Sequence, residues 1–142
     1  MKVSQEEKTD KVFDMVAAVC YSSFDGVQRP PEGILRDKFL TGDVFFAACD
    51  DIFAGFAIVI QRLDHPYLWT IAVAEDYRGY GVGRRLLNEI TEDNRDAGYI
   101  ELVCKVDNPA QRLYFDAGYR VVRVDRSFYG AEGPGLVMRR EV

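Results

Sequence analysis

The stretch Tyr77–Arg84, which reads Y-R-G-Y-G-V-G-R, constrains the fold of this chain most. Three glycines alternate between two arginines, an apolar strand-like run (residues 67–73) precedes them, and an amphipathic helical pattern follows. A strand, a glycine-rich turn and a helix N-terminus together bind anions, because glycines let the backbone approach a ligand and the first helical N–H groups point at it. The segment therefore predicts a phosphate or pyrophosphate site, with a turn that only joins strand to helix as the structural alternative.

Three phosphate-loop patterns compete for this segment. A Walker loop needs G-x-x-x-x-G-K-[ST], and the chain contains no Gly-Lys pair. A dinucleotide loop, G-x-G-x-x-G, starting at Gly79 would need a glycine at Arg84, and no convincing acid follows at the required distance. A third pattern, [RQ]-x-x-G-x-[GA], fits Arg78, Gly81 and Gly83. The third pattern is therefore favoured.

Composition narrows the class of protein. The 142 residues are 48% hydrophobic and 13% aromatic, which suits a single globular domain over residues 1–142. No apolar run is long enough to span a membrane, no secretory segment opens the chain, and three dispersed cysteines fit a reducing cytoplasm. One histidine makes a His/Cys metal site improbable, so no metal is expected. The net charge of −5 argues against nucleic-acid binding and is compatible with a cationic amine substrate.

Hydrophobic periodicity and turn residues predict an alternation of helices and strands. A capping box at Ser4–Glu7 would open the first helix. Helices are expected over residues 6–22, 32–40, 81–96 and from Pro109 to Gly118. Strands are expected over residues 44–49, 52–62, 67–74, 100–106, 119–124 and 136–140. The Asp50-Asp51 turn would make a hairpin of the first two strands, and the last two would close an antiparallel pair. This order predicts a layered α/β domain with a mixed sheet.

A second motif lies downstream of the glycine run. Residues 107–119 read D-N-P-A-Q-R-L-Y-F-D-A-G-Y, which resembles N-x-x-A-x-x-L-Y-x-x-x-G-[FY]. Two motifs, this one and the run over residues 71–84, carry a resemblance to the GNAT superfamily of acyl-CoA-dependent N-acyltransferases. The resemblance covers roughly residues 44–140. Within this superfamily, the pattern is nearest to ribosomal-protein and protein N-terminal acetyltransferases. The resemblance implies a mixed, mostly antiparallel sheet flanked by helices, although the family's usual first strand is not obvious in residues 1–4.

The resemblance implies acetyl-CoA, or coenzyme A, as co-substrate, with no metal. The end of the strand before the loop would offer its backbone to the pantetheine arm, through Ile71, Ala72 and Val73. The loop would cradle the pyrophosphate, through Arg78, Gly79, Tyr80, Gly81, Val82, Gly83 and Arg84. Counting back from Ala110, the family's asparagine falls on Asp107, with Asn108 one place later. Asn108 is favoured for this role, because a carboxylate is unhelpful beside phosphates.

The same resemblance assigns catalytic roles. Tyr114 matches the family tyrosine near the cofactor sulfur, where its phenol would donate a proton or hydrogen bond to the departing thiolate. The position that carries a glutamate in ribosomal-protein acetyltransferases is Leu102 or Val103 here, and neither ionises. Glu101 shares a strand face with Val103 and is the candidate base, acting through water. The alternatives are a merely solvated Glu101, weaker candidates around residues 64–67 and Glu75, or no dedicated base. Cys104 as a nucleophile is disfavoured, because no partner base is visible.

The acceptor amine is left open. Residues 126–139 look like the closing hairpin of protein N-terminal acetyltransferases, which would make Tyr129, with Phe128, substrate-binding. The predicted partners are acetyl-CoA and a primary amine, either a peptide N-terminus or a small molecule, with no nucleic acid and no membrane. A monomer or a homodimer is expected. The alternative function is a catalytically idle acyl-CoA-binding or interaction module on the same fold.

Overall fold

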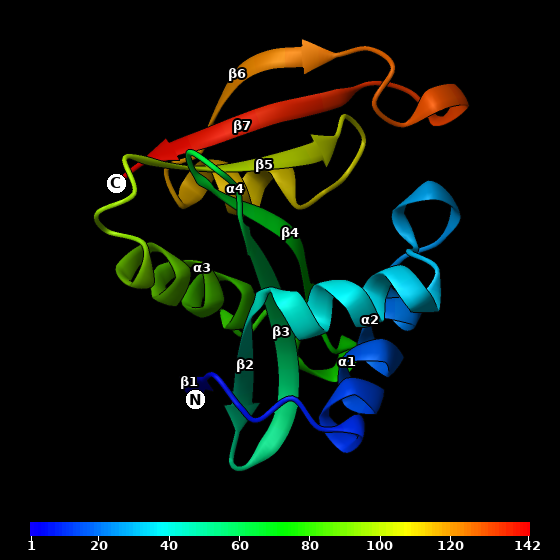
Figure 1. Cartoon of the computed structure of the whole chain (residues 1–142), viewed down its shortest axis with the longest axis vertical. Coiled ribbons are helices and arrows are strands. Elements are labelled where there is room, and N and C mark those ends of the chain that lie inside the picture. Colours follow the sequence, from blue (N-terminus) through cyan, green and yellow to red (C-terminus); the bar gives the residue numbers. More distant parts are fainter.

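One open seven-stranded sheet carries the fold in the computed structural model, which describes residues 1–142 (Figure 1). The strands are β1 (Lys2–Ser4), β2 (Asp43–Cys49), β3 (Ile52–Gln61), β4 (Pro66–Val73), β5 (Tyr99–Lys105), β6 (Arg120–Asp125) and β7 (Gly135–Glu141). The α-helices are α1 (Asp10–Ser23), α2 (Glu32–Thr41), α3 (Val82–Asp93) and α4 (Gln111–Asp116). The strand order is β1-β2-β3-β4-β5-β7-β6, and only β4 and β5 are parallel. The predicted mixed, mostly antiparallel sheet is confirmed.

The N-terminal segment differs from the prediction. Helix α1 begins at Asp10 rather than at residue 6, and Thr9 caps it by accepting a hydrogen bond from the Val12 N–H at 3.2 Å. The predicted capping box at Ser4 is wrong, because residues 2–4 form β1 and pair with β2, with Ser4 opposite Phe46. The strand not evident from sequence is therefore present, and pairing with the edge of the sheet uses the backbone groups that a longer helix would need. Helix α3 also stops early, at Asp93, where the Asn94 side chain donates to the Ile90 carbonyl at 2.8 Å.

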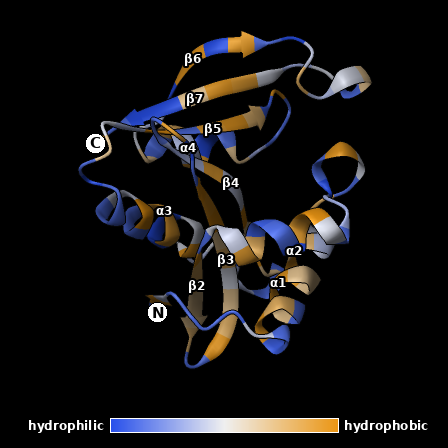
Figure 2. Ribbon diagram, viewed as in Figure 1, coloured by the Kyte–Doolittle hydropathy of each residue, from blue (hydrophilic) through white to orange (hydrophobic).

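Two hydrophobic clusters lie on opposite faces of the sheet. Because successive strand side chains point to opposite faces, β3 sends Ala57 and Val59 to one cluster and Phe56 and Ile58 to the other. Helix α3 covers the first face, and α1 and α2 cover the second (Figure 1). Apolar colour accordingly concentrates on the central strands and on the inner sides of the helices (Figure 2). The result is a helix–sheet–helix sandwich around β2, β3 and β4.

The sheet splits between β4 and β5. These parallel strands share one register pair, Tyr67 with Glu101, near the start of both strands. Beyond this pair the strands diverge, and the β5-β7-β6 part stands apart from the β1–β4 part in Figure 1. The edge of β4 that faces β5 therefore has no strand partner from residue 68 to residue 73, so backbone groups on this edge can bind an extended ligand. None of the helices combines the length and apolar character needed to cross a membrane.

Candidate active site

A continuous groove follows the split in the sheet. It consists of an inner, a middle and an outer cavity, with volumes of about 190, 540 and 360 Å³. The inner and middle cavities share four lining residues, Phe24, Gln28, Ile71 and Asn108. The middle and outer cavities share Val73, Arg78, Gly83 and Leu113. The groove thus runs from the glycine-rich loop, along the free edge of β4, to the base of the split.

The glycine-rich loop forms the outer cavity. Gly79 and Gly81 have φ angles of 83° and 82°, a left-handed conformation that favours glycine. Gly81 caps α3, and the first helical hydrogen bond runs from the Arg85 N–H to the Gly81 carbonyl at 3.0 Å. The amides of residues 82–84 therefore have no acceptor within the helix. Together with the helix dipole, these amides make an anion site beside the cavity.

Not every residue predicted in this loop has the expected surroundings. The Arg78 guanidinium donates to the Val73 carbonyl at 3.0 Å and to Ser23 Oγ at 3.1 Å, so it braces β4 against α1. The Tyr80 ring is 74% exposed and lines none of the three cavities. A Cβ on Gly83 would lie 2.9 Å from a methyl carbon of Leu113, so this glycine also leaves room for Leu113 of α4 against α3. Ile71, Ala72 and Val73 line the middle cavity as expected.

Asp107 and Asn108, the two candidates for the family's asparagine, differ in their surroundings. The Asn108 side chain accepts a hydrogen bond from the Ala110 N–H at 2.9 Å and lines both the inner and the middle cavity. Asp107 lines only the middle cavity, and its side chain is 73% exposed and lies 3.9 Å from Lys105 Nζ. The geometry therefore supports Asn108 for the family position.

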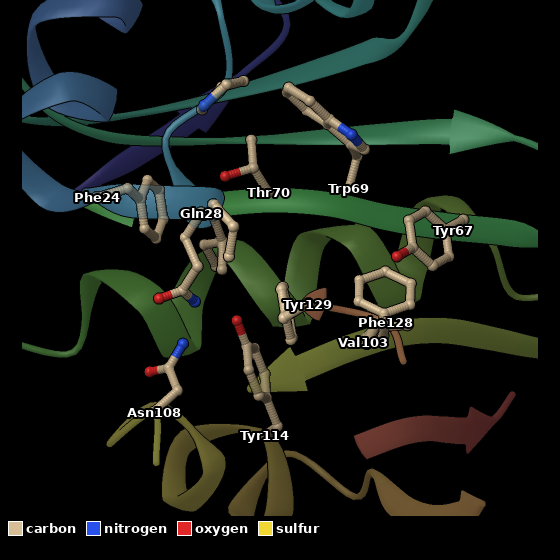
Figure 3. A pocket seen from close by; sticks show the side chains of 13 residues that line it. Phe24, Gln28, Tyr67, Trp69, Thr70, Val103, Asn108, Tyr114, Phe128 and Tyr129 are labelled. Atoms are coloured by element: carbon tan, nitrogen blue, oxygen red, sulfur yellow. The ribbon is translucent and has the colours of Figure 1, made fainter. Parts of the chain in front are cut away.

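Three phenols meet in the inner cavity. Tyr114 projects from α4, and its hydroxyl points into the cavity that Tyr67 and Tyr129 also line (Figure 3). Helix α4 is anchored by Ala110, Leu113 and Ala117 against the core, which fixes the direction of Tyr114. Burial raises the pKa of Tyr114 and of Tyr129 well above the usual range for a phenol. Both side chains therefore remain neutral hydrogen-bond donors at every pH at which the protein would work.

Glu101 does not line the inner cavity. Its carboxylate is buried, accepts a hydrogen bond from Arg139 Nε at 2.8 Å, and lies 3.7 Å from His65 Nε2 and 3.9 Å from an Arg62 nitrogen. The physical reason is the geometry of the split: Glu101 sits where β4 and β5 still pair, whereas Val103, two residues later, reaches the cavity. Glu101 is thus separated from the inner cavity by Tyr67 and Val103, and its role as a base that acts through water stays a prediction.

Cys104 is buried behind the cavity. Burial raises the pKa of its thiol to about 11, and the thiol donates to the Lys105 carbonyl at 3.5 Å. A thiol with this pKa is almost fully protonated near neutral pH and is a poor nucleophile. Burial and the raised pKa thus argue against Cys104 as an acyl-carrying nucleophile.

Sequence reasoning missed much of the cavity wall. Phe24, Val27, Gln28 and Pro30 come from the loop between α1 and α2, and Trp69 and Thr70 come from β4. Their approach depends on where this loop packs, and no local motif signals it. Glu132 was also missed: its carboxylate accepts hydrogen bonds from the Val27 N–H at 2.9 Å and from Lys105 Nζ at 3.3 Å. This contact, the Glu132 bridge, joins the α1–α2 loop to the loop between β6 and β7.

Residues 41–121 match the family model described as the acetyltransferase (GNAT) domain. The chain belongs to the GNAT family. A [ribosomal protein bS18]-alanine N-acetyltransferase of Salmonella typhimurium is 32% identical to this GNAT protein over 83 residues, 56% of each chain. An uncharacterized protein of Mycobacterium leprae is 41% identical over 98 residues, 64% of this chain and 27% of the relative. The chain thus spans between about a quarter and just over half of the length of these relatives.

Solved structures share the whole fold of this GNAT protein. The crystal structure of the ribosomal-protein-S18-alanine N-acetyltransferase from Escherichia coli superposes with a TM-score of 0.85 at 22% identity, over 99% of this chain and 93% of that one. A Bacillus subtilis acetyltransferase in complex with CoA gives a TM-score of 0.81 at 18% identity, over 99% and 98% of the two chains. At these identities the likeness establishes the fold.

Proposed function

We propose that this protein is an N-acetyltransferase that transfers an acetyl group from acetyl-CoA to a primary amine by direct attack in a ternary complex. The observation that carries the proposal is the groove, which leads from free amides at the N-terminus of α3, along the unpaired edge of β4, to the Tyr114 hydroxyl. Membership in the GNAT family and relatives named as N-acetyltransferases support it. The proposal treats residues 1–142 as one domain acting in the cytoplasm, as a monomer or a homodimer.

The groove offers binding groups for two parts of coenzyme A, the pyrophosphate and the pantetheine arm. Amides of residues 79–84 would hold the pyrophosphate, and the edge of β4 over residues 71–73 that lacks a strand partner would pair with the pantetheine arm as an added strand. Asn108 lies where this arm would reach the inner cavity. The bound CoA of the Bacillus subtilis neighbour supports this class of ligand. No group of three or more His, Cys, Asp or Glu side chains gathers in a metal-binding arrangement in residues 1–142.

Tyr114 would supply the acid for the reaction. As the amine nitrogen bonds to the acetyl carbon, the bond from that carbon to sulfur breaks and negative charge develops on the sulfur. The neutral phenol of Tyr114 donates its proton, or a hydrogen bond, to this charge. No carboxylate lines the inner cavity, so removal of the amine proton depends on desolvation and water, with Glu101 acting at most through the neighbouring Tyr67.

Thiol release tests the proposal. The protein is mixed with acetyl-CoA and with pooled small amines or N-terminal peptides, while CoA binding is measured separately by calorimetry. We expect CoA to bind and at least one pool to release free thiol above the rate without acceptor. CoA binding with no thiol release from any pool would instead identify an acyl-CoA-binding module. Failure to bind CoA would overturn both functions.

A further inference from the structure

The wall of the inner cavity carries no charged side chain. Thirteen residues line it, nine of them hydrophobic, and none is Asp, Glu, Lys, Arg or His. Six aromatic rings dominate the wall: Phe24, Tyr67, Trp69, Tyr114, Phe128 and Tyr129 (Figure 3). The polar groups are phenols, the Thr70 hydroxyl and two carboxamides. This wall differs from the chain as a whole, whose net charge is −5.

Two carboxylates beside this wall are already paired, and Asp25 and Asp107 line the middle cavity but not the inner one. Glu101, behind Tyr67, binds Arg139 at 2.8 Å. Glu132, at the loops that bound the cavity, binds Lys105 at 3.3 Å and the Val27 N–H at 2.9 Å. A cation that entered the cavity would therefore find aromatic faces and neutral acceptors but no free counter-charge.

Such a wall accepts one amine and penalises a second charge. Aromatic rings attract a single ammonium, and hydroxyl and carboxamide groups can hydrogen-bond to it. A further charge on the same substrate would be buried without a partner, which is unfavourable. An acceptor that carries one amine beside an apolar group matches this wall, whereas polyamines do not.

The lack of a base in the wall favours an α-amine over a lysine side chain. At about pH 7.5, roughly a third of free α-amines are neutral, compared with about a thousandth of lysine ε-amines. Without a dedicated base, an α-amine is therefore present in its neutral, nucleophilic form far more often than a lysine ε-amine. Residues of the α1–α2 loop and of the β6–β7 loop line the cavity, so the remainder of a peptide would extend past these loops while its first residue occupies the cavity.

We infer that the acceptor is the N-terminal α-amine of a peptide whose first residue has an apolar or aromatic side chain. This inference rests on the proposed function, because it takes the inner cavity as the acceptor site. The apolar first side chain packs against Phe128, Trp69 and Val103, while the amine faces the phenols and the carboxamides.

Binding tests the inference independently of turnover. Trp69 is the only tryptophan of the chain and lines the cavity, so its fluorescence reports occupancy. Peptides that are identical except for Phe, Leu, Lys or Asp as first residue, and spermidine, are titrated into the CoA-bound protein. We expect the Phe and Leu peptides to bind at least about tenfold more tightly than the Lys and Asp peptides and spermidine, the scale of one uncompensated charge. Equal or tighter binding of the Lys peptide or spermidine would overturn the inference.

A matched pair of variants tests whether the uncharged wall causes the preference for an apolar first residue. Gln28→Glu adds a carboxylate to the cavity wall at nearly constant volume, and Gln5→Glu adds the same charge at an exposed site away from this cavity. We expect Gln28→Glu to reduce the preference for Phe over Lys as first residue by about tenfold and Gln5→Glu to leave it unchanged. An unchanged preference in Gln28→Glu would show that the wall does not select by charge. If the Phe peptide binds selectively but no thiol is released, the proposed transferase activity fails while the inference about the ligand holds.

Discussion

At the scale of single residues, burial decides what each polar group can do. Tyr114 is only 8% exposed, yet its hydroxyl faces the cavity. Desolvation raises the pKa of this hydroxyl, which therefore keeps its proton and can donate a hydrogen bond. Glu101 is 4% exposed, and its carboxylate is occupied by Arg139. The two residues predicted to be catalytic therefore differ in position, since only Tyr114 lines the inner cavity.

Tyr114→Phe should lower kcat by about 10²-fold, the usual contribution of one positioned acid. The ring remains, so the KM for acetyl-CoA and the affinity for CoA should change little. Steady-state thiol release and calorimetry measure the two quantities. Because the raised pKa keeps the phenol protonated, kcat of the natural protein should rise as the acceptor loses its proton and should not decline up to about pH 9.5. Unchanged turnover in the variant would rule out Tyr114 as the acid.

Glu101→Gln should mainly lower stability. The substitution removes a charge-assisted hydrogen bond to Arg139 at the single register pair of β4 and β5, and such a bond is worth about 1–3 kcal/mol. Denaturant unfolding measures this loss, with Glu141→Gln, an exposed change of the same type, as control. The folded variant should keep kcat within about threefold, because the carboxylate does not reach the cavity. A loss of about a hundredfold in the folded variant would restore Glu101 as the base.

At the scale of elements, two helices define the groove. Helix α3 presents its first amides to the outer cavity, and α4 presents Tyr114 to the inner one. They approach closely because Gly83 has no side chain where Leu113 packs. The glycine-rich loop therefore has two functions, one in ligand binding and one in packing.

Gly83→Ala should lower stability by no more than about 1 kcal/mol, because the new methyl group displaces the end of the Leu113 side chain, 2.9 Å away, while alanine favours the helix more than glycine does. It should also weaken CoA binding, since α3 and α4 both line the groove. Thermal unfolding and calorimetry measure these effects. Adding Leu113→Ala to Gly83→Ala makes room for the methyl group, so the two changes together should cost less than the sum of their separate costs. Strict additivity would show that the contact with Leu113 does not limit this position.

At the scale of the whole molecule, the two parts of the sheet share one hydrophobic cluster but few hydrogen-bonded links. One is the single β4–β5 register pair, and another is the Glu132 bridge between the α1–α2 loop and the β6–β7 loop. The inner cavity lies between these two links and is lined from both parts. The relative position of the two parts should therefore control the shape of the cavity.

Glu132→Gln should loosen the α1–α2 loop, because the neutral side chain binds the Val27 N–H and Lys105 less strongly. Hydrogen exchange of residues 24–30 near neutral pH should become faster, while Glu141→Gln, on an exposed site of β7, should leave it unchanged. These hydrogen bonds hold the pKa of Glu132 below its usual 4.5. The bridge is therefore fully present above that value and is lost as the pH falls through the lowered pKa. If hydrogen exchange of residues 24–30 is the same in wild type and in Glu132→Gln near neutral pH, the Glu132 bridge does not hold the α1–α2 loop.

The sequence by itself determined the features that depend on short-range physics. The glycine pattern of residues 78–84, the helix that carries Tyr114 and the order of strands and helices follow from φ preferences and from hydrophobic periodicity within a few residues. Only the tertiary structure decided that β4 and β5 diverge after one pair, that Val103 rather than Glu101 reaches the cavity, and that the α1–α2 loop completes the wall. These features join residues that are more than 30 positions apart, and their contacts depend on the order in which the strands pack, which no local pattern contains.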